Sequence, residues 1–233
     1  MRPVAIFRFS PTEGPGRFAE WLDAHGVARR VIALDAGDPV PQGPDAFSGI
    51  AMMGGQMSAN DPLSWNAPLT ELLRSAVAKD VPVIGHCLGG QLLARALGAE
   101  VTRAPAPEIG WGEVRATSNE APEWFGNRDR FVTFQWHYDA FALPSGATRV
   151  LTNSVNSEQA YALGKHIGLQ GHIEMTRSMV ETWCRTGASE LPEQTVGTTQ
   201  SRTDIMNDLD ARLRDLGEVA DGVYAQWAKG LVG

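Results

Sequence analysis

Strand-like and helix-like segments alternate along the first hundred residues, and this alternation restricts the possible folds more than any other feature of the chain. Three of the four apolar, β-prone runs are followed by a stretch with apolar residues at helical spacing. This order predicts a parallel sheet whose connecting helices cover both of its faces. The expected strands are residues 3–9, 31–34, 47–53 and 81–86, and the expected helices are 16–25, 69–78 and 88–97.

In the second half of the chain, short strands follow one another without intervening helices. We expect hairpins here, and hence a mixed or antiparallel edge of the sheet. The chain then becomes helical from about residue 176, apart from a loop over 187–201 that is rich in Gly, Ser, Thr and Pro. The expected strands are 111–116, 131–136, 148–152, 159–163 and 167–170, and the expected closing helices are 204–216 and 218–231.

These elements predict an α/β, flavodoxin-like three-layer sandwich. Its central sheet is expected to be mostly parallel, with helices on both faces and a small antiparallel strand region. The length of 233 residues suits one ample domain, and no internal repeat divides it. We expect residues 1–186 to form the main domain, and residues 187–233 to supply a C-terminal loop and helices that pack on it.

Charge and composition exclude several classes of protein. The net charge is −7 and no run of Lys or Arg stands out, so a nucleic-acid partner is not expected. No apolar stretch approaches the length of a membrane span, and the N-terminus turns polar too quickly for a signal peptide. The two cysteines, Cys87 and Cys184, give no disulfide framework. We therefore expect a cytoplasmic protein without a membrane partner.

The segment Gly85-His86-Cys87-Leu88-Gly89 places a cysteine at a sharp junction between a strand and a helix. Glycines on both sides remove side chains that would clash in such a bend, so a nucleophile is held exposed above the sheet. The helix that follows directs its free amides at the sulfur and favours the thiolate. Cys87 is therefore the candidate nucleophile, although a buried structural cysteine also fits this residue type.

A thiol nucleophile needs a base and a group that orients the base, and His172 and Glu174 fit these two roles. They lie two residues apart on an extended segment, so both side chains point to one face. The carboxylate would fix the tautomer of the imidazole. Of the other histidines, we expect His86 to point to the opposite side of the strand end and His166 to lie in a turn.

These motifs resemble those of the class I (cysteine-triad) glutamine amidotransferases. Residues 85–91, Gly-His-Cys-Leu-Gly-Gly-Gln, match that family's Gly-x-Cys-x-Gly-x-Gln signature. Residues 168–174, Gly-Leu-Gln-Gly-His-Ile-Glu, resemble its Gly-Val-Gln-Phe-His-Pro-Glu. Four further segments resemble small stand-alone members akin to the amidotransferase domain of GMP synthase and to γ-glutamyl peptidases. They are 13–16, 53–61, 108–111 and 136–139, and the resemblance covers about residues 3–186.

The resemblance implies a role for each matched residue. The triad is Cys87, His172 and Glu174, and the backbone amides of Gly55 and Leu88 form the oxyanion hole. Attack on a carboxamide makes a tetrahedral oxyanion, which needs such preorganised donors. Residues expected to bind the substrate are Gln91, which lies one turn into the helix after the nucleophile, with His137 and Tyr138.

Four residues near the expected pocket depart from the family pattern. Gln56 and Ile173 stand where proline is usual, Tyr138 replaces a common glycine, and Gly171 replaces an aromatic residue. None of them is a member of the triad. They bear on the choice of substrate more than on the chemistry.

The resemblance implies hydrolysis or transfer at a γ-glutamyl amide through a cysteine thioester, with no cofactor. In one version, glutamine releases ammonia for a synthetase on a separate chain. In the other, a stand-alone γ-glutamyl peptidase cleaves γ-glutamyl peptides or conjugates. The chain has no P-loop pattern and no fused synthetase, which favours the second version.

Two other classes of function stay open at this point. A metal-dependent hydrolase would take ligands from His137-x-Asp139, His172-x-Glu174 and Cys87, although we expect no metal. A binding module would keep the fold without turnover.

A dinucleotide site is a weaker alternative. Gly14, Gly16 and Asp35 imitate its fingerprint. Residues 10–13 separate the glycines from the preceding strand, however, and Glu13 would face a pyrophosphate.

Overall fold

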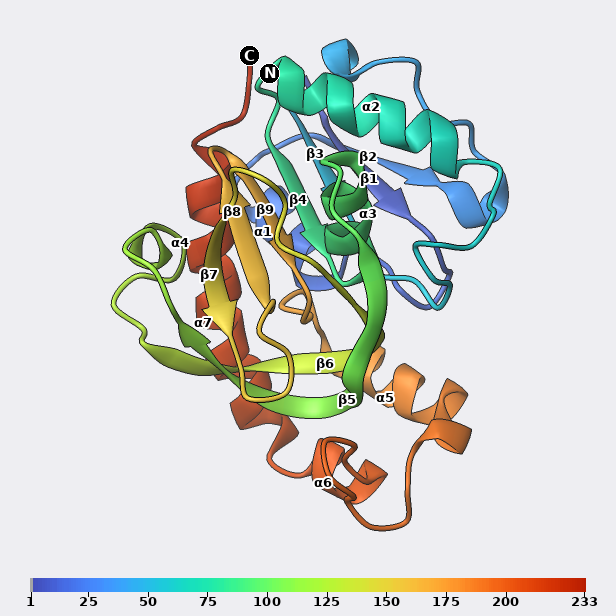
Figure 1. The fold of residues 1–233 in the computed structure, drawn as a ribbon, viewed down its shortest axis with the longest axis vertical. Coiled ribbons are helices and arrows are strands. Elements are labelled where there is room, and N and C mark those ends of the chain that lie inside the picture. The colour runs from blue at the N-terminus through green and yellow to red at the C-terminus, as the bar shows by residue number, and fades with distance from the viewer. Residues whose placement is uncertain (1) are drawn as a thin grey trace.

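The computed structural model describes residues 2–233. Within them, nine strands form one sheet in the order β2-β1-β3-β4-β9-β8-β7-β5-β6 (Figure 1). The strands are β1 (Val4–Arg8), β2 (Arg29–Ala33), β3 (Gly49–Met52), β4 (Val83–His86), β5 (Val101–Ala116), β6 (Arg130–Phe141), β7 (Thr148–Thr152), β8 (Ala160–Leu163) and β9 (His166–Leu169).

Strands β2, β1, β3 and β4, which the alternating segments predicted, pair in parallel. Strand β9, which was expected among the hairpin strands, joins them by pairing in parallel with β4. Their order has the 2-1-3-4-5 pattern of flavodoxin-like sheets. The remaining pairings, from β9 through β8, β7 and β5 to β6, are antiparallel. The sheet is therefore mixed, and the expectation of a small antiparallel region was wrong, because the hairpin half supplies as many strand pairings as the parallel half.

The strands β5 and β6 are much longer than the predicted segments 111–116 and 131–136. They form one curved antiparallel ribbon, paired from Val101 opposite Phe141 to Arg115 opposite Arg130 (Figure 1). The pairing is interrupted by a bulge over residues 104–107. Two prolines lie in this bulge. Because proline cannot donate to a strand ladder, they hide the first part of β5 from a prediction based on periodicity.

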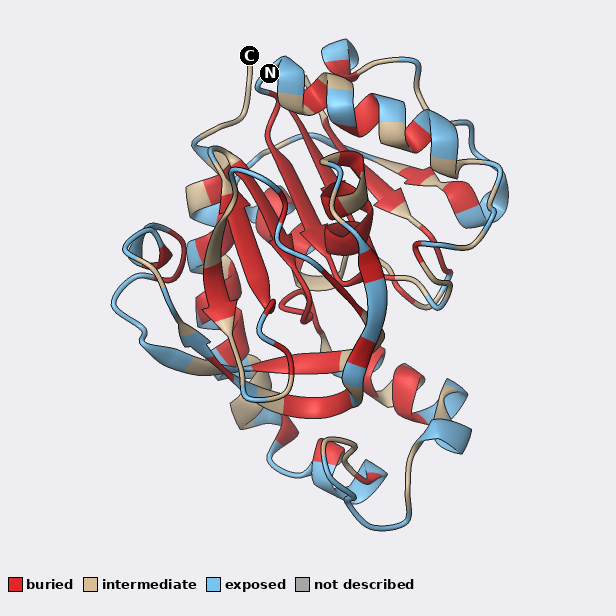
Figure 2. Ribbon diagram, viewed as in Figure 1, coloured by how far each residue is buried: buried red, intermediate tan, exposed pale blue. Residues whose placement is uncertain are grey.

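Helices cover both faces of the sheet. On one face lie α2 (Asn66–Ala78) and α3 (Leu88–Ala96), and on the other face α1 (Gly16–Ala24) packs against the long C-terminal helix α7 (Leu209–Ala228) (Figure 1). The strands between them are buried along most of their length (Figure 2). The shorter elements are α4 (Ala121–Phe125), α5 (Arg177–Thr186), α6 (Arg202–Met206) and three 3₁₀ turns, η1 (Leu34–Ala36), η2 (Pro44–Ala46) and η3 (Ala188–Glu190).

The C-terminal helix α7 is continuous, whereas the sequence predicted two helices that meet near Gly217. This glycine lies inside the helix because the Arg17 side chain of α1 passes close to it. A Cβ at Gly217 would lie only 2.8 Å from the guanidinium carbon of Arg17. Arg17 reaches past it to pair with Asp221 at 2.7 Å. Glycine here therefore allows close helix packing rather than ending a helix.

His166 opens strand β9 and does not lie in a turn as predicted. Its ring is buried, and its Nδ1 accepts a hydrogen bond from the backbone amide of Val83 at 3.2 Å. Burial lowers the pKa of His166 to about 4, so the ring is neutral at physiological pH.

Within residues 2–233, no helix combines the length and the apolarity needed to cross a bilayer.

Candidate active site

Cys87 lies between the end of β4 and the start of α3, at the carboxyl edge of the parallel strands. Its φ of 47° and ψ of −108° are values that L-residues rarely adopt. The backbone amide of Cys87 donates a hydrogen bond of 2.8 Å to the carbonyl of Leu169, which ends the neighbouring strand β9. The bend that presents the thiol is thus fixed by the adjacent strand.

The glycines around Cys87 each allow a close backbone approach. A Cβ at Gly85 would lie 2.4 Å from the carbonyl carbon of Gly89, and a Cβ at Gly89 would lie 2.4 Å from the carbonyl oxygen of Met52. A Cβ at Gly90 would meet the carbonyl oxygen of Leu169 at 2.6 Å. The first turn of α3 therefore sits directly on β3, β4 and β9, which explains the run of glycines in this segment.

His172 and Glu174 follow β9 and lie beside the elbow. The backbone amide of His172 donates to the carbonyl of Phe134 in β6 at 2.7 Å, so the segment is held by the hairpin half of the sheet. Nδ1 of His172 lies 2.6 Å from Oε1 of Glu174, and both side chains are 1% exposed. The sulfur of Cys87 lies 4.0 Å from the carbonyl oxygen of Trp136 and 3.8 Å from Nε2 of Gln170. The imidazole of His172 is close enough for its charge to interact with this sulfur.

The charged forms of His172 and Glu174 stabilise each other. Burial lowers the pKa of His172, but the neighbouring Glu174 carboxylate and Cys87 sulfur outweigh burial and raise it well above the usual range. Burial raises the pKa of Glu174, but the His172 charge outweighs it and brings the value to about 2. The geometry thus favours an imidazolium between a carboxylate and the sulfur.

His86 is buried beneath this group, with its Nε2 4.0 Å from Oε2 of Glu174. Its Nδ1 lies 3.3 Å from the carbonyl of Met52, and Nε2 lies 3.5 Å from the hydroxyl of Tyr224 in α7. Burial lowers the pKa of His86, so the ring is neutral and adds no second positive charge. His86 is absent from the cavity that Cys87 lines.

The two residues whose amides are expected to form an oxyanion hole pack against each other. Gly55 follows β3 and Leu88 begins α3, and a Cβ at Gly55 would be 2.5 Å from Cδ2 of Leu88. Within residues 2–233, neither amide donates a hydrogen bond to another backbone carbonyl. Both residues line the cavity above the thiol.

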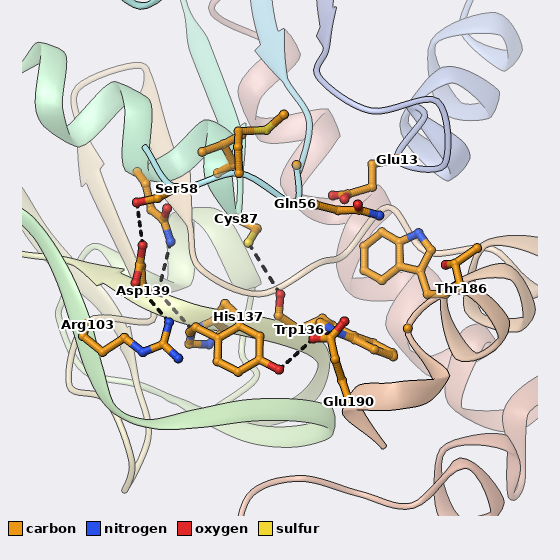
Figure 3. Close-up of a pocket in the computed structure, with 17 residues that line it drawn as sticks. Glu13, Gln56, Ser58, Cys87, Arg103, Trp136, His137, Asp139, Thr186 and Glu190 are labelled. Atoms are coloured by element: carbon orange, nitrogen blue, oxygen red, sulfur yellow. Dashed lines mark hydrogen bonds and ion pairs between the residues drawn. The ribbon is translucent and has the colours of Figure 1, made fainter. Parts of the chain in front are cut away.

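A cavity of about 500 Å³ lies above Cys87, and all the residues predicted to bind substrate line it (Figure 3). The side chain of Gln91 donates to the carbonyl of Asp139 at 3.0 Å. Nδ1 of His137 lies 3.1 Å from the same carbonyl, and its Nε2 lies 3.3 Å from the buried carboxylate of Glu108. Nε2 of His137 is buried and makes no hydrogen bond to another described residue, although it lies within ion-pair distance of Glu108.

Tyr138 connects two charged residues at the rim of the cavity. Its hydroxyl donates to Glu190 at 2.7 Å, and the guanidinium of Arg103 lies 4.6 Å from the centre of its ring (Figure 3). Burial and the hydrogen bond to Glu190 raise the pKa of Tyr138 to about 12. A glycine at this position, as the family commonly has, would provide neither contact.

Several residues of the cavity were not assigned a role from the sequence. Glu13, Ser58 and Trp136 lie in segments that resemble the family. The sequence therefore marked these segments but did not predict a role for the three side chains. Arg103 and Glu190 lie beside the β5 bulge and in the 3₁₀ turn η3, where no periodic pattern marks a residue. All five line the cavity.

Gly171 replaces the usual aromatic residue because other side chains occupy that space. A Cβ at Gly171 would lie 2.8 Å from Oγ1 of Thr133 and 2.9 Å from Nε2 of Gln135. These two polar side chains of β6 are hydrogen-bonded to each other at 2.7 Å. The departure at Gly171 is thus compensated by residues of the neighbouring strand and does not open the cavity.

Glu13 is a buried carboxyl group in the loop between β1 and α1. Its Oε2 and the Cε1 atom of His172 both lie within 3 Å of the point where a Cβ of Gly54 would stand, at 2.4 and 2.7 Å. Burial raises the pKa of Glu13 to about 7, even though the charge of His172 opposes this shift. A carboxyl group that is half protonated near neutrality therefore adjoins the imidazole.

The raised pKa of Glu13 predicts a pH-dependent loss of stability. The folded state holds this proton more tightly than the unfolded chain, so the stabilisation is complete below about pH 4.5 and is lost as pH rises through 7. We expect Glu13→Gln to abolish this loss, so that the variant gains about 2 kcal/mol relative to wild type between pH 5 and pH 8. Urea unfolding at both pH values measures the gain. The exposed Glu20→Gln is the control, and parallel curves for Glu13→Gln and wild type would contradict the assignment.

The dinucleotide alternative is not supported by the loop between β1 and α1. A Cβ at Gly16 would lie 2.2 Å from the carbonyl oxygen of Glu174, so this glycine serves the approach of the loop to the candidate triad. Trp183 of α5 donates its indole N–H to the carbonyl of Thr12 at 2.9 Å and fixes the same loop.

The side chains proposed as metal ligands are engaged in other contacts. His172 is bonded to Glu174, and the Asp139 carboxylate accepts a hydrogen bond from Ser58 at 2.8 Å. In the described part of the chain, no three His, Cys, Asp or Glu side chains are grouped as a metal site.

Comparison with known proteins gives a consistent family. A family model described as glutamine amidotransferase class-I matches residues 24–182. The crystal structure of a glutamine amidotransferase from Methylobacillus flagellatus superposes with a TM-score of 0.97 at 45% identity, covering 100% of this chain and 96% of the other.

Two curated relatives are more distant. A GMP synthase of Aeropyrum pernix is 31% identical over 185 residues, which are 69% of this chain and 33% of the synthase, so the chain spans about a third of that protein. Gamma-glutamyl peptidase 4 of Arabidopsis thaliana is 25% identical over 154 residues, covering 63% of this chain and 61% of the peptidase.

Proposed function

The chain belongs to the class I glutamine amidotransferase family, and from this premise we propose that it hydrolyses a γ-glutamyl amide through a thioester on Cys87. The observation that carries the proposal is a cysteine at a strained strand-to-helix bend, beside an imidazole whose Nδ1 lies 2.6 Å from a buried carboxylate. A thiol, a base and an orienting acid are the parts that nucleophilic catalysis requires.

In the proposed reaction, the sulfur of Cys87 attacks the amide carbon and forms a C–S bond, while the thiol proton resides on His172. The amide oxygen becomes an oxyanion, which the amides of Gly55 and Leu88 stabilise by hydrogen bonds. The C–N bond then breaks, and His172 returns the proton to the leaving nitrogen. Water, deprotonated by His172, attacks the thioester, and glutamate and the free thiol are released.

The amino acid end of the substrate is proposed to lie over Gln91, Ser58 and Asp139. This part of the cavity is lined by Gln91 and Ser58, whose side chains both donate hydrogen bonds to Asp139. Such hydrogen-bonding groups suit an α-amino acid, whose ammonium and carboxylate need acceptors and donors at fixed positions. Tyr138 is held in place by Glu190 and Arg103 and closes this part of the cavity.

Two versions of the reaction follow from the leaving group. With glutamine, the products are glutamate and ammonia, which a synthetase on a separate chain would consume. With a γ-glutamyl conjugate, the product is a larger amine. The second version is favoured by the extension of the cavity past Cys87 to Trp183, Thr186 and Glu190, since ammonia needs no such space.

A substrate panel tests the proposal. Purified protein is incubated with glutamine, γ-glutamyl dipeptides, glutathione conjugates and, as a control, asparagine, which is one methylene shorter. We expect glutamate from at least one of the γ-glutamyl compounds and no aspartate from asparagine. An acid-quenched sample should carry a glutamyl mass on the peptide that contains Cys87. If no γ-glutamyl compound yields glutamate or the adduct, the proposed function is wrong.

A further inference from the structure

The amine that leaves a γ-glutamyl amide departs on the side of the cavity where His172 lies, because this imidazole returns its proton to the leaving nitrogen. The indole of Trp183 in α5 stands edge-on to the His172 ring, with ring centres 4.7 Å apart. Glu13 adjoins the same ring. Ser58 and Asp139 lie on the other side of Cys87 (Figure 3). The leaving group therefore faces α5 and the turn that follows it.

A carboxylate held by aromatic side chains forms the outer part of this region. Oε2 of Glu190 accepts hydrogen bonds from the indole N–H of Trp136 at 3.1 Å and from the hydroxyl of Tyr138 at 2.7 Å (Figure 3). Both donors are neutral, so they hold the Glu190 carboxylate in position without neutralising its charge. Arg103, the cation that lines the cavity, is paired instead with Asp139 at 3.7 Å.

The position of Glu190 depends on a glycine at the end of α5. A Cβ at Gly187 would lie 2.5 Å from Cζ2 of Trp136 and 3.2 Å from Oε1 of Glu190. The missing side chain lets the indole and the carboxylate meet at this point. The rings of Trp136 and Trp183 are perpendicular, with centres 6.2 Å apart, and complete an aromatic wall.

This wall suits a cation and opposes an anion. Aromatic faces attract positive charge, and a fixed carboxylate beside them strengthens the attraction. On the inner side, Glu13 is a second carboxyl group, whose pKa burial raises to about 7. A positively charged group would stabilise its ionised form, whereas a carboxylate on the leaving amine would be repelled by both Glu13 and Glu190.

Resting on the proposed function, we infer that Trp136, Trp183 and Glu190 form a subsite for a positively charged leaving group. The preferred substrates are then γ-glutamyl amides of amines that carry a second cationic group at the far end of a short alkyl chain. γ-Glutamyl dipeptides, whose leaving amine bears a carboxylate, are poor substrates.

The test uses three matched sets of γ-glutamyl amides, with leaving amines of three to five carbons that end in an ammonium, a methyl or a carboxylate group. For the preferred chain length, we expect kcat/KM to be at least about tenfold higher for the ammonium than for the methyl compound, and lowest for the carboxylate. Glu190→Gln keeps the shape and an acceptor oxygen, so it should remove most of the ammonium preference. The exposed Glu193→Gln, in the same segment, should keep the wild-type ratio.

The ratio of two substrates on one preparation does not depend on the folded fraction, so a destabilised variant still gives a valid result. If all three compounds are hydrolysed at similar rates, or if Glu190→Gln keeps the preference, the subsite is wrong while the proposed function stands. If neither glutamine nor any of the amides yields glutamate, the proposed function fails and the subsite fails with it.

Discussion

Cys87→Ala is expected to lower kcat for γ-glutamyl hydrolysis by about a million-fold, the scale seen when a nucleophile is removed from a catalytic triad. The alanine leaves His172, Glu174 and the two oxyanion amides in place but has no atom that can form the thioester. Glutamate release measures the loss, and circular dichroism checks that the fold is kept.

The same prediction includes covalent labelling. A γ-glutamyl analogue with an electrophilic group should modify Cys87 and abolish activity. Cys184 is the matched control, because it is fully buried in the core, and burial raises its pKa and keeps the thiol protonated. Peptide mapping should find the label at Cys87 alone, and Cys184→Ala should keep nearly full activity. Label at Cys184, or turnover by Cys87→Ala, would remove Cys87 as the nucleophile.

Glu174→Gln is expected to lower kcat by about ten-thousand-fold, as for the corresponding change in a serine triad. A glutamine can still contact Nδ1 of His172, but it lacks the charge that keeps the pKa of this buried imidazole raised. The imidazolium therefore loses its support, and the base is no longer held as the proposed reaction needs.

A second measurement separates this effect from misfolding. The pKa of His172, followed by NMR, should fall in folded Glu174→Gln, because burial then dominates. Glu181→Gln, at a partly exposed position of α5 where the carboxylate pairs with Arg177 at 3.1 Å, is the control and should change neither turnover nor the pKa of His172. Wild-type turnover in a folded Glu174→Gln protein would show that Glu174 does not orient the base.

The parallel half of the fold could be predicted from the sequence because each of its elements carries a local pattern. Apolar runs and helical spacing mark β1 to β4 and α1 to α3, and the observed bounds differ by only a few residues. The hairpin half was underestimated, because the prolines in the β5 bulge interrupt the alternation and the ribbon is held by its partner strand rather than by local preference. The helix end predicted at Gly217 was wrong for a related reason. A glycine is needed there because Arg17, from a helix distant in the sequence, packs against this position.

The residues proposed to be catalytic could be predicted from the sequence, but the shape of the cavity could not. Cys87, His172 and Glu174 stand in short motifs whose backbone geometry dictates residue type, and the structure brings the three together. Glu190 and Arg103 reach the same cavity from segments without a motif, through contacts with Tyr138. Contacts between residues so far apart in the sequence depend on how the whole chain folds, and no local sequence pattern predicts them.

The pairing of β4 with β9 also bears on when the candidate site is assembled during synthesis. All of β5 to β8 lies between these neighbouring strands in the chain. A ribosome adds roughly 5–20 residues per second, so Cys87 emerges seconds before the strand that carries its acceptor Leu169 and its partner His172. Closing so long a loop is also a slow step of folding. Until it closes, Cys87 lacks the neighbours that the proposed reaction requires, so the candidate site is assembled only after β9 has joined the sheet.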